Sequence, residues 1–62
     1  MPPRHVEILQ HLADGLNMIE IADKMGRTHD SIKQESYRIR EHLGADTNCQ
    51  AVAMAMRRKL IN

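Results

Sequence analysis

Four polar side chains in the middle of the chain combine complementary hydrogen-bonding groups with helical spacing. They are a cation, an amide, a phenol and a guanidinium, namely Lys33, Gln34, Tyr37 and Arg38. In a helix they would lie opposite Ile32, because successive residues are turned by about 100°. Lysine can donate to guanine O6 and N7, glutamine can pair with the adenine edge, and arginine and tyrosine suit phosphate oxygens. The set indicates duplex DNA as a ligand, although an ordinary solvated face contains the same residue types.

The residues just before this set favour the DNA interpretation. Thr28 is a typical N-cap, and Ser31 would lie in the first helical turn, where hydroxyls and free N–H groups can hold a phosphate. Gly26 would end a shorter helix, which gives the order of a helix-turn-helix motif. Many unrelated proteins join short helices through a glycine, so the polar face directly after the turn carries the prediction.

The elements that would position these side chains are predicted to be four helices, which makes the fold class all-α. Strands are not expected, because the chain has one aromatic residue and no alternating β-branched run. Early prolines suit a first helical turn, and the three glycines suit helix ends. The expected helices of this single domain, 1–62, span about 3–14, 18–25 (the scaffold helix), 29–42 (the recognition helix) and 48–59 (the dimerisation helix).

Capping patterns and apolar spacing support these ranges. Asn17 with Glu20, and Thr47 with Gln50, match the capping box, in which two free N–H groups are satisfied reciprocally. Residues three and four apart share one face of a helix. The expected inward positions are Ile8, Leu9, Leu12, Ile21, Ala22, Met25, Ile32, Ser36, Ile39 and Leu43.

Length, charge and cysteine content restrict the class of protein. A chain of 62 residues is one small domain with a small core. Its net charge is only +1, but residues 1–26 carry −2 and residues 27–62 carry +3, so DNA would bind the positive half. The single cysteine, Cys49, indicates a reducing compartment, and no segment suits a bilayer or a signal peptide. We therefore expect a cytoplasmic protein with no membrane partner.

Histidines and the thiol do not suggest a metal centre or a catalytic site. The four histidines include no pair at i, i+4, and Cys49 has no nearby partner. No nucleophile, base and orienting group gather in the sequence. The five methionines suit core filling and interface contact better than a cofactor site. The sequence therefore predicts neither an enzyme nor a bound cofactor or metal.

Short segments along almost the whole chain follow, in order and without gaps, the pattern of one known family. Pro3-Arg4 and then Glu7-Ile8-Leu9 are similar to its Pro-Arg-Glu…Glu-Val-Leu start, and residues 12–16 are similar to its Leu-Ala-Glu-Gly-Leu. Other similar segments are Glu20-Ile21-Ala22, Met25-Gly26, Ser31-Ile32-Lys33, Arg38-Ile39, Leu43-Gly44, 51–55, Arg57-Arg58 and Leu60-Ile61. Together these segments resemble the LuxR/GerE-type helix-turn-helix DNA-binding domain family.

The resemblance implies a four-helix domain that binds DNA, usually as a dimer, and regulates transcription. It places base contacts at Lys33, Gln34 and Tyr37, and phosphate contacts near Thr28, Ser31 and Arg38. Most members carry this domain behind a receiver or ligand-binding domain. We expect a standalone domain here, so the usual switch would not be supplied by this chain.

Several departures from the family pattern concern affinity and target sequence more than fold. Arg27 stands at a turn position that is usually Ile or Val, and we expect it to reach solvent or a DNA phosphate. Asp30 stands at an often basic position, where it would weaken phosphate attraction or select a cytosine amine. Glu35 replaces a common histidine at the core edge, and Met18 and Ile19 are apolar where the family is usually polar.

An apolar run in the last predicted helix predicts a homodimer. Residues 51–56 are all apolar and would cover every side of a helix, whereas a surface helix needs one apolar stripe. Val52 and Ala55 are expected to fill that stripe, with Met54 near its boundary. The residues left facing outward, and expected to form the dimer interface, are Cys49, Ala53 and Met56.

A function of a different class stays open. A domain of this fold could be a protein-interaction module that antagonises or adapts a larger transcription regulator or RNA polymerase. The small net charge and the expected exposure of Met18 and Ile19 favour this alternative. The ordered polar face that contains Lys33, Gln34 and Tyr37 favours DNA.

Overall fold

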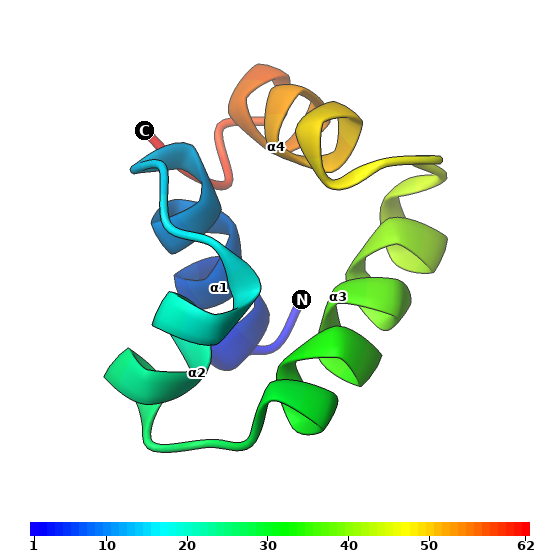
Figure 1. Ribbon diagram of the computed structural model, residues 1–62. Coiled ribbons are helices and arrows are strands. Elements are labelled where there is room, and N and C mark those ends of the chain that lie inside the picture. The colour runs from blue at the N-terminus through cyan, green and yellow to red at the C-terminus, as the bar shows by residue number, and fades with distance from the viewer.

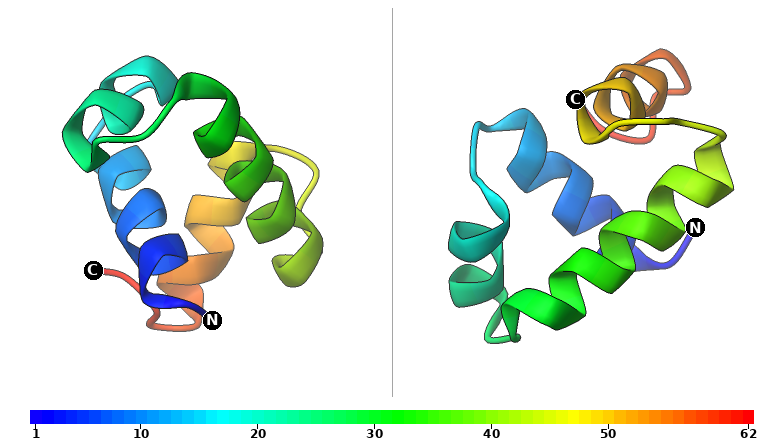
Figure 2. Two further views of the ribbon diagram at one scale, coloured as in Figure 1. Left: turned by 90° about the horizontal axis from the view of Figure 1, so that it is seen from below. Right: turned by 45° about the vertical axis from the view of Figure 1, so that its right-hand side comes forward.

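A computed structural model, which describes residues 1–62, confirms an all-α fold of four helices. The helices are α1 (Pro3–Ala13), α2 (Met18–Met25), α3 (His29–Leu43) and α4 (Asn48–Arg57) (Figure 1). α1 packs against the other three, whereas α2 and α4 contact α3 but not each other (Figure 2). None of the helices combines the length and apolar character needed to cross a membrane.

Side-chain caps fix where the shorter helices begin. Before α2, Asn17 Oδ1 accepts from the Glu20 N–H at 2.8 Å and Glu20 Oε1 accepts from the Asn17 N–H at 2.9 Å, which confirms the first capping box. Before α4, Thr47 Oγ1 accepts from the Gln50 N–H at 3.0 Å. The other hydrogen bond of the predicted second capping box is wrong. The Gln50 side chain accepts from the Asp46 N–H at 2.7 Å and not from the Thr47 N–H.

The helix expected over 48–59 ends earlier, at Arg57. Lys59 adopts a left-handed conformation with φ of 59°, and the Leu60 N–H donates to the Ala55 carbonyl at 2.9 Å. This turn directs Ile61 back into the core, where 7% of it is exposed. A helix continued to residue 59 would carry Ile61 away from the core, so the burial of this side chain explains the early end.

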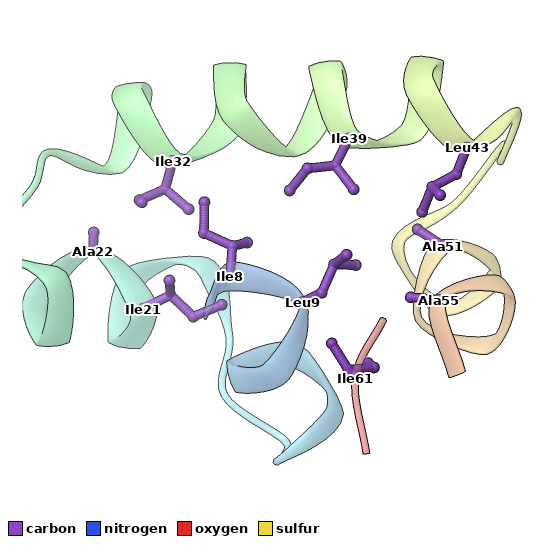
Figure 3. Packing of buried hydrophobic residues seen from close by; sticks show 10 residues of the cluster. All are labelled: Ile8, Leu9, Ile21, Ala22, Ile32, Ile39, Leu43, Ala51, Ala55 and Ile61. Carbon is purple, nitrogen blue, oxygen red and sulfur yellow. The ribbon is translucent and has the colours of Figure 1, made fainter. Parts of the chain in front are cut away.

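The core draws apolar side chains from every helix and from the C-terminal segment. On α3, Ile32 and Ile39 point toward Ile8 and Leu9 of α1, and Leu43 points toward Ala51 of α4 (Figure 3). The remaining buried apolar residues are Ile21, Ala22, Ala51, Ala55 and Ile61. The predicted inward positions Leu12 and Met25 are half-buried and pack against this cluster, and Ser36 is buried beside it. One face of α3 is thereby committed to the core.

Two details of the expected packing are wrong. The stripe that α4 buries consists of Ala51 and Ala55, whereas Val52 is only half-buried. Small side chains four residues apart allow α4 to approach α1 and α3 closely, which explains the choice. Met18 is half-buried against the core, since it shares a face of α2 with Ile21 and Ala22 three and four residues later.

Candidate nucleic-acid interface

The turn between α2 and α3 sets the direction of the exposed helix. Gly26 is left-handed, with φ of 67°, and the Arg27 N–H donates to the Ala22 carbonyl at 2.8 Å. Thr28 Oγ1 then accepts from the Ser31 N–H at 3.1 Å and starts α3. The two helices therefore form a helix-turn-helix pair whose second member is α3 (Figure 1).

The side chains singled out in the sequence as base-reading candidates lie together on the outer face of α3. Lys33, Gln34 and Tyr37 are exposed, and 56% of Tyr37 is accessible. With Arg38 and Arg40 they line one shallow, open depression. Figure 2 shows α3 along one side of the molecule, with its outer face uncovered by another helix. Nothing in the fold separates these groups from a large partner.

Arg27, Thr28 and Ser31 gather at the N-terminal end of this face. Arg27 is exposed, and its Nη2 donates to Ser31 Oγ at 2.7 Å. Its charge is not buried. The unusual arginine in the turn therefore lies in solvent and does not disturb the packing of the core. Thr28 is exposed as well, and its hydroxyl oxygen already serves as the cap of α3. This end of α3 therefore offers one guanidinium and two hydroxyl groups to a partner.

A buried carboxylate lies on one flank of α3 and contacts three basic side chains. The sequence did not predict its burial. Glu35 is only 4% exposed. Its Oε2 lies 2.6 Å from Arg4 Nε and 2.6 Å from His5 Nε2, both on α1, and its Oε1 accepts from Arg38 Nη1 at 3.0 Å. The Arg4 guanidinium, with a smaller effect from His5, holds the pKa of Glu35 below its ordinary value, although burial opposes this. The carboxylate is therefore ionised and ties the start of α1 to α3.

The opposite flank of α3 carries a second missed residue, Arg40. Its guanidinium carbon lies 6.0 Å from the centre of the Tyr37 ring, and its Nη1 donates to Asn48 Oδ1 at 2.6 Å. Asn48 is the first residue of α4, and its Oδ1 also accepts from Ser36 Oγ at 3.1 Å. Helical spacing could have identified Arg40 from the sequence, because it falls seven residues after Lys33 and hence on the same side of the helix.

A family profile described as bacterial regulatory proteins of the luxR family matches residues 1–55 of the chain. The chain belongs to this family. No curated protein and no solved structure matches it significantly. Domains of the luxR family bind DNA and regulate transcription, and in general they are not enzymes. The helix-turn-helix geometry of α2 and α3 is consistent with membership.

In this luxR-family domain, one departure from the family pattern contacts the start of α1. The resemblance places a histidine at the position of Glu35, which the sequence predicted at the core edge. The structure brings Glu35 to 2.6 Å from His5, a partner that the sequence did not identify.

The outward face of α4 in this luxR-family domain is apolar. Cys49, Ala53 and Met56 are all exposed, and 43% of Met56 is accessible. A groove of about 230 Å³ runs beside them, lined by Leu12, Ala13, Asn48, Cys49, Val52 and Met56. Five of these six lining residues are hydrophobic, and all six belong to α1 or α4, so the groove lies between these two helices.

Proposed function

We propose that this domain regulates transcription by binding double-stranded DNA sequence-specifically, with α3 in the major groove. One observation carries the proposal: on the exposed face of α3, the neutral hydrogen-bonding side chains Gln34 and Tyr37 lie between cations on both flanks. The exposed carboxylates of Asp30 and Glu41 share this face and set a limit on its positive charge. Gln34 and Tyr37 lie opposite the core, with Lys33 beside Tyr37. Arg40 lies toward α4, and Arg38 lies toward the start of α1. A helix in the major groove has base edges in front of it and a phosphate backbone on either side.

The residue roles follow from position and chemistry. Base contacts are assigned to Lys33, Gln34 and Tyr37, whose ends are free on the outer face. Phosphate contacts are assigned to Arg27, Thr28, Ser31 and Arg38. Of these, Arg38 already pairs with Glu35, so its positive charge is partly compensated before DNA arrives. We expect the domain to act in the cytoplasm.

The homodimer belongs to the same proposal. An exposed apolar strip of Cys49, Ala53 and Met56 on α4 suits a second copy of the same helix, because a two-fold interface buries one surface against itself. Two copies would also double the modest electrostatic attraction of a chain with a net charge of +1.

Selection on random duplex DNA, followed by salt titration of the winning sequence, tests the proposed function. The expected result is one recovered sequence motif and an affinity that falls linearly with the logarithm of salt concentration. Recovery of no motif, with no salt-dependent binding to any duplex, would contradict DNA binding by this chain.

The second candidate is a protein-interaction module that binds a larger regulator or RNA polymerase. Ile19, on the exposed side of α2 with 66% of its surface accessible, is the observation that favours it. The exchange Ile19→Gln separates the two functions. Binding to the selected duplex should be unchanged under the DNA proposal, whereas association with a protein partner should weaken.

A further inference from the structure

Arg40 differs from Arg4 and Arg38, the two arginines at the other flank of α3, in the partner that holds it. Arg4 and Arg38 both bond to the carboxylate of Glu35, which compensates part of their charge. Arg40 bonds instead to a neutral amide, that of Asn48, and no carboxylate lies within ion-pair distance of it. Its full positive charge is therefore available to an anion. Long-range attraction to phosphate depends on such uncompensated charge.

The guanidinium of Arg40 is also held in place. One edge donates to Asn48 Oδ1 at 2.6 Å, and Asn48 is itself anchored by Ser36 Oγ at 3.1 Å. The guanidinium carbon of Arg40 also lies over the Tyr37 ring, 6.0 Å from the ring centre. An arginine has five N–H donors, so donors remain free after the single bond to Asn48. A side chain ordered before binding loses less conformational entropy when it binds.

The surroundings of Arg40 form a depression at the junction of α3 and α4. It is lined by Met18, His29, Lys33, Ser36, Arg40 and Asn48. No carboxylate is among these residues, whereas Lys33 and Arg40 bring two cations to it. Its position on one flank of α3 is where a DNA backbone would pass if the centre of the helix faced base edges.

We infer that the junction of α3 and α4 binds a DNA backbone phosphate, with Arg40 as the contacting group and Asn48 as its positioning residue. The inference rests on the proposed function and adds a phosphate site to it. It also joins α4 to α3, because the first residue of α4 orients a contact made by α3.

The first test replaces Arg40 by alanine and measures affinity for the selected duplex across salt concentrations. One lost phosphate contact should lower the slope of log affinity against log salt by about 0.9 per bound protomer. When the salt concentration falls from about 1 M to about 0.1 M, the gain in affinity should therefore be about eightfold smaller for the variant than for the parent. Affinity for random duplex should fall in the same proportion, because a phosphate contact does not depend on sequence. Arg57→Ala, which removes an exposed charge at the far end of α4, is the matched control and should leave the slope unchanged.

The second test is Asn48→Asp, which keeps the shape and the acceptor oxygen but adds a negative charge. The new carboxylate would pair with Arg40 and compensate its charge, so affinity should fall and the salt slope should become shallower. An acid in the first turn of α4 favours the helix, so the melting temperature should stay or rise. If Asn48 only stabilised the fold, DNA affinity would follow the melting temperature and would stay unchanged or rise with it.

The outcomes separate this inference from the function on which it rests. Parent protein that binds no duplex would overturn the proposed function. Parent protein that binds its selected duplex, with Arg40→Ala giving the same salt slope as the Arg57→Ala control, would overturn the phosphate site alone. Asn48→Asp with parental affinity would overturn the positioning role.

Discussion

A buried carboxylate is expensive to desolvate, and Glu35 is tolerated because three basic side chains surround it. Arg4 and His5 reach it from α1, and Arg38 reaches it from its own helix. Breaking this cluster would leave the buried His5 without its partner, which destabilises more than the loss of an exposed ion pair, whereas Arg4 and Arg38 are accessible to water. The charge on α3 that is proposed to face DNA and the stability of the domain are therefore linked through this residue.

Replacing Glu35 by glutamine should lower the free energy of unfolding by about 2 kcal/mol at neutral pH, because the amide lacks the charge and has one acceptor oxygen where the carboxylate uses two. The folded state lowers the pKa of Glu35 from its ordinary 4.5, so the stabilisation is complete above that value. It is lost as pH falls through the lower folded-state pKa. Urea unfolding of parent and variant at pH 7 and in acid should show a difference that shrinks in acid. A difference that is constant with pH would mean that the carboxylate charge is not the cause.

The polar groups on α3 should separate into two classes by mutation. Lys33→Ala and Gln34→Ala should each reduce discrimination between the selected and random duplexes by about 1–3 kcal/mol. Arg38→Ala should instead weaken both duplexes alike and give a shallower salt slope. Titrations of all three variants on both duplexes distinguish the classes. Parental binding by all of them would show that α3 does not dock as proposed.

Arg27 gives a third test at the level of a single residue. Its guanidinium is exposed and bonds only to Ser31 Oγ, so Arg27→Ile should leave the melting temperature nearly unchanged. If the arginine contacts phosphate, the variant should bind DNA more weakly, with a salt slope that is shallower by about 0.9 per protomer. Unchanged binding would make Arg27 a tolerated surface substitution.

Among the elements, α4 combines two different surfaces. Its alanine stripe, Ala51 and Ala55, lies in the core, and its opposite side presents Cys49, Ala53 and Met56 to solvent. This division would let one helix stabilise the monomer and also form the proposed contact with a second copy. Substitutions on the outer side can therefore test association without disturbing the fold.

Ala53→Glu should prevent dimer formation, because it would place like charges across the two-fold axis. The monomer should keep its melting temperature, since Ala53 is exposed. Ala53→Ser changes the same exposed position without adding a charge, so it serves as the control. Sedimentation with the selected duplex should give two protomers per site for the control and one for Ala53→Glu. Equal affinity and equal stoichiometry in both variants would exclude α4 as the interface.

At the scale of the whole molecule, size constrains how two copies could share one DNA site. The longest extent of a protomer is 28 Å, which is shorter than one helical turn of about 34 Å. Two protomers can therefore occupy successive turns on one face of the duplex without overlap. Footprinting at saturation should protect two half-sites whose centres lie about 10 base pairs apart. Protection of a single half-site would contradict the dimer.

Most of the architecture could be predicted from local signals. The glycines at 15, 26 and 44 all adopt the left-handed conformation that ends helices, and apolar residues at helical spacing identified the buried faces of α1, α2 and α3. These signals act within a few residues of each other, so the sequence states them directly. The same reasoning placed Lys33, Gln34 and Tyr37 on one exposed face.

What could not be predicted depends on contacts between distant segments. Glu35 meets His5 across 30 positions, and a charged residue is buried only when such partners exist. Arg40 meets Asn48 from another helix, and Ile61 returns to the core through a turn after α4. The choice of Ala51 over Val52 for the buried stripe depended on how closely helices pack. Periodicity within one helix contains none of this information.

The position of Tyr37 has a practical consequence for spectroscopy. It is the only aromatic residue among Phe, Trp and Tyr in the chain, and it stands exposed on α3 beside Lys33, Gln34 and Arg40. Biosynthetic incorporation of fluorotyrosine would therefore give one fluorine resonance, located on the proposed recognition surface, with no competing signal from elsewhere. The protein carries a natural single-site label, and ligand titrations could be followed at that site without introducing a mutation.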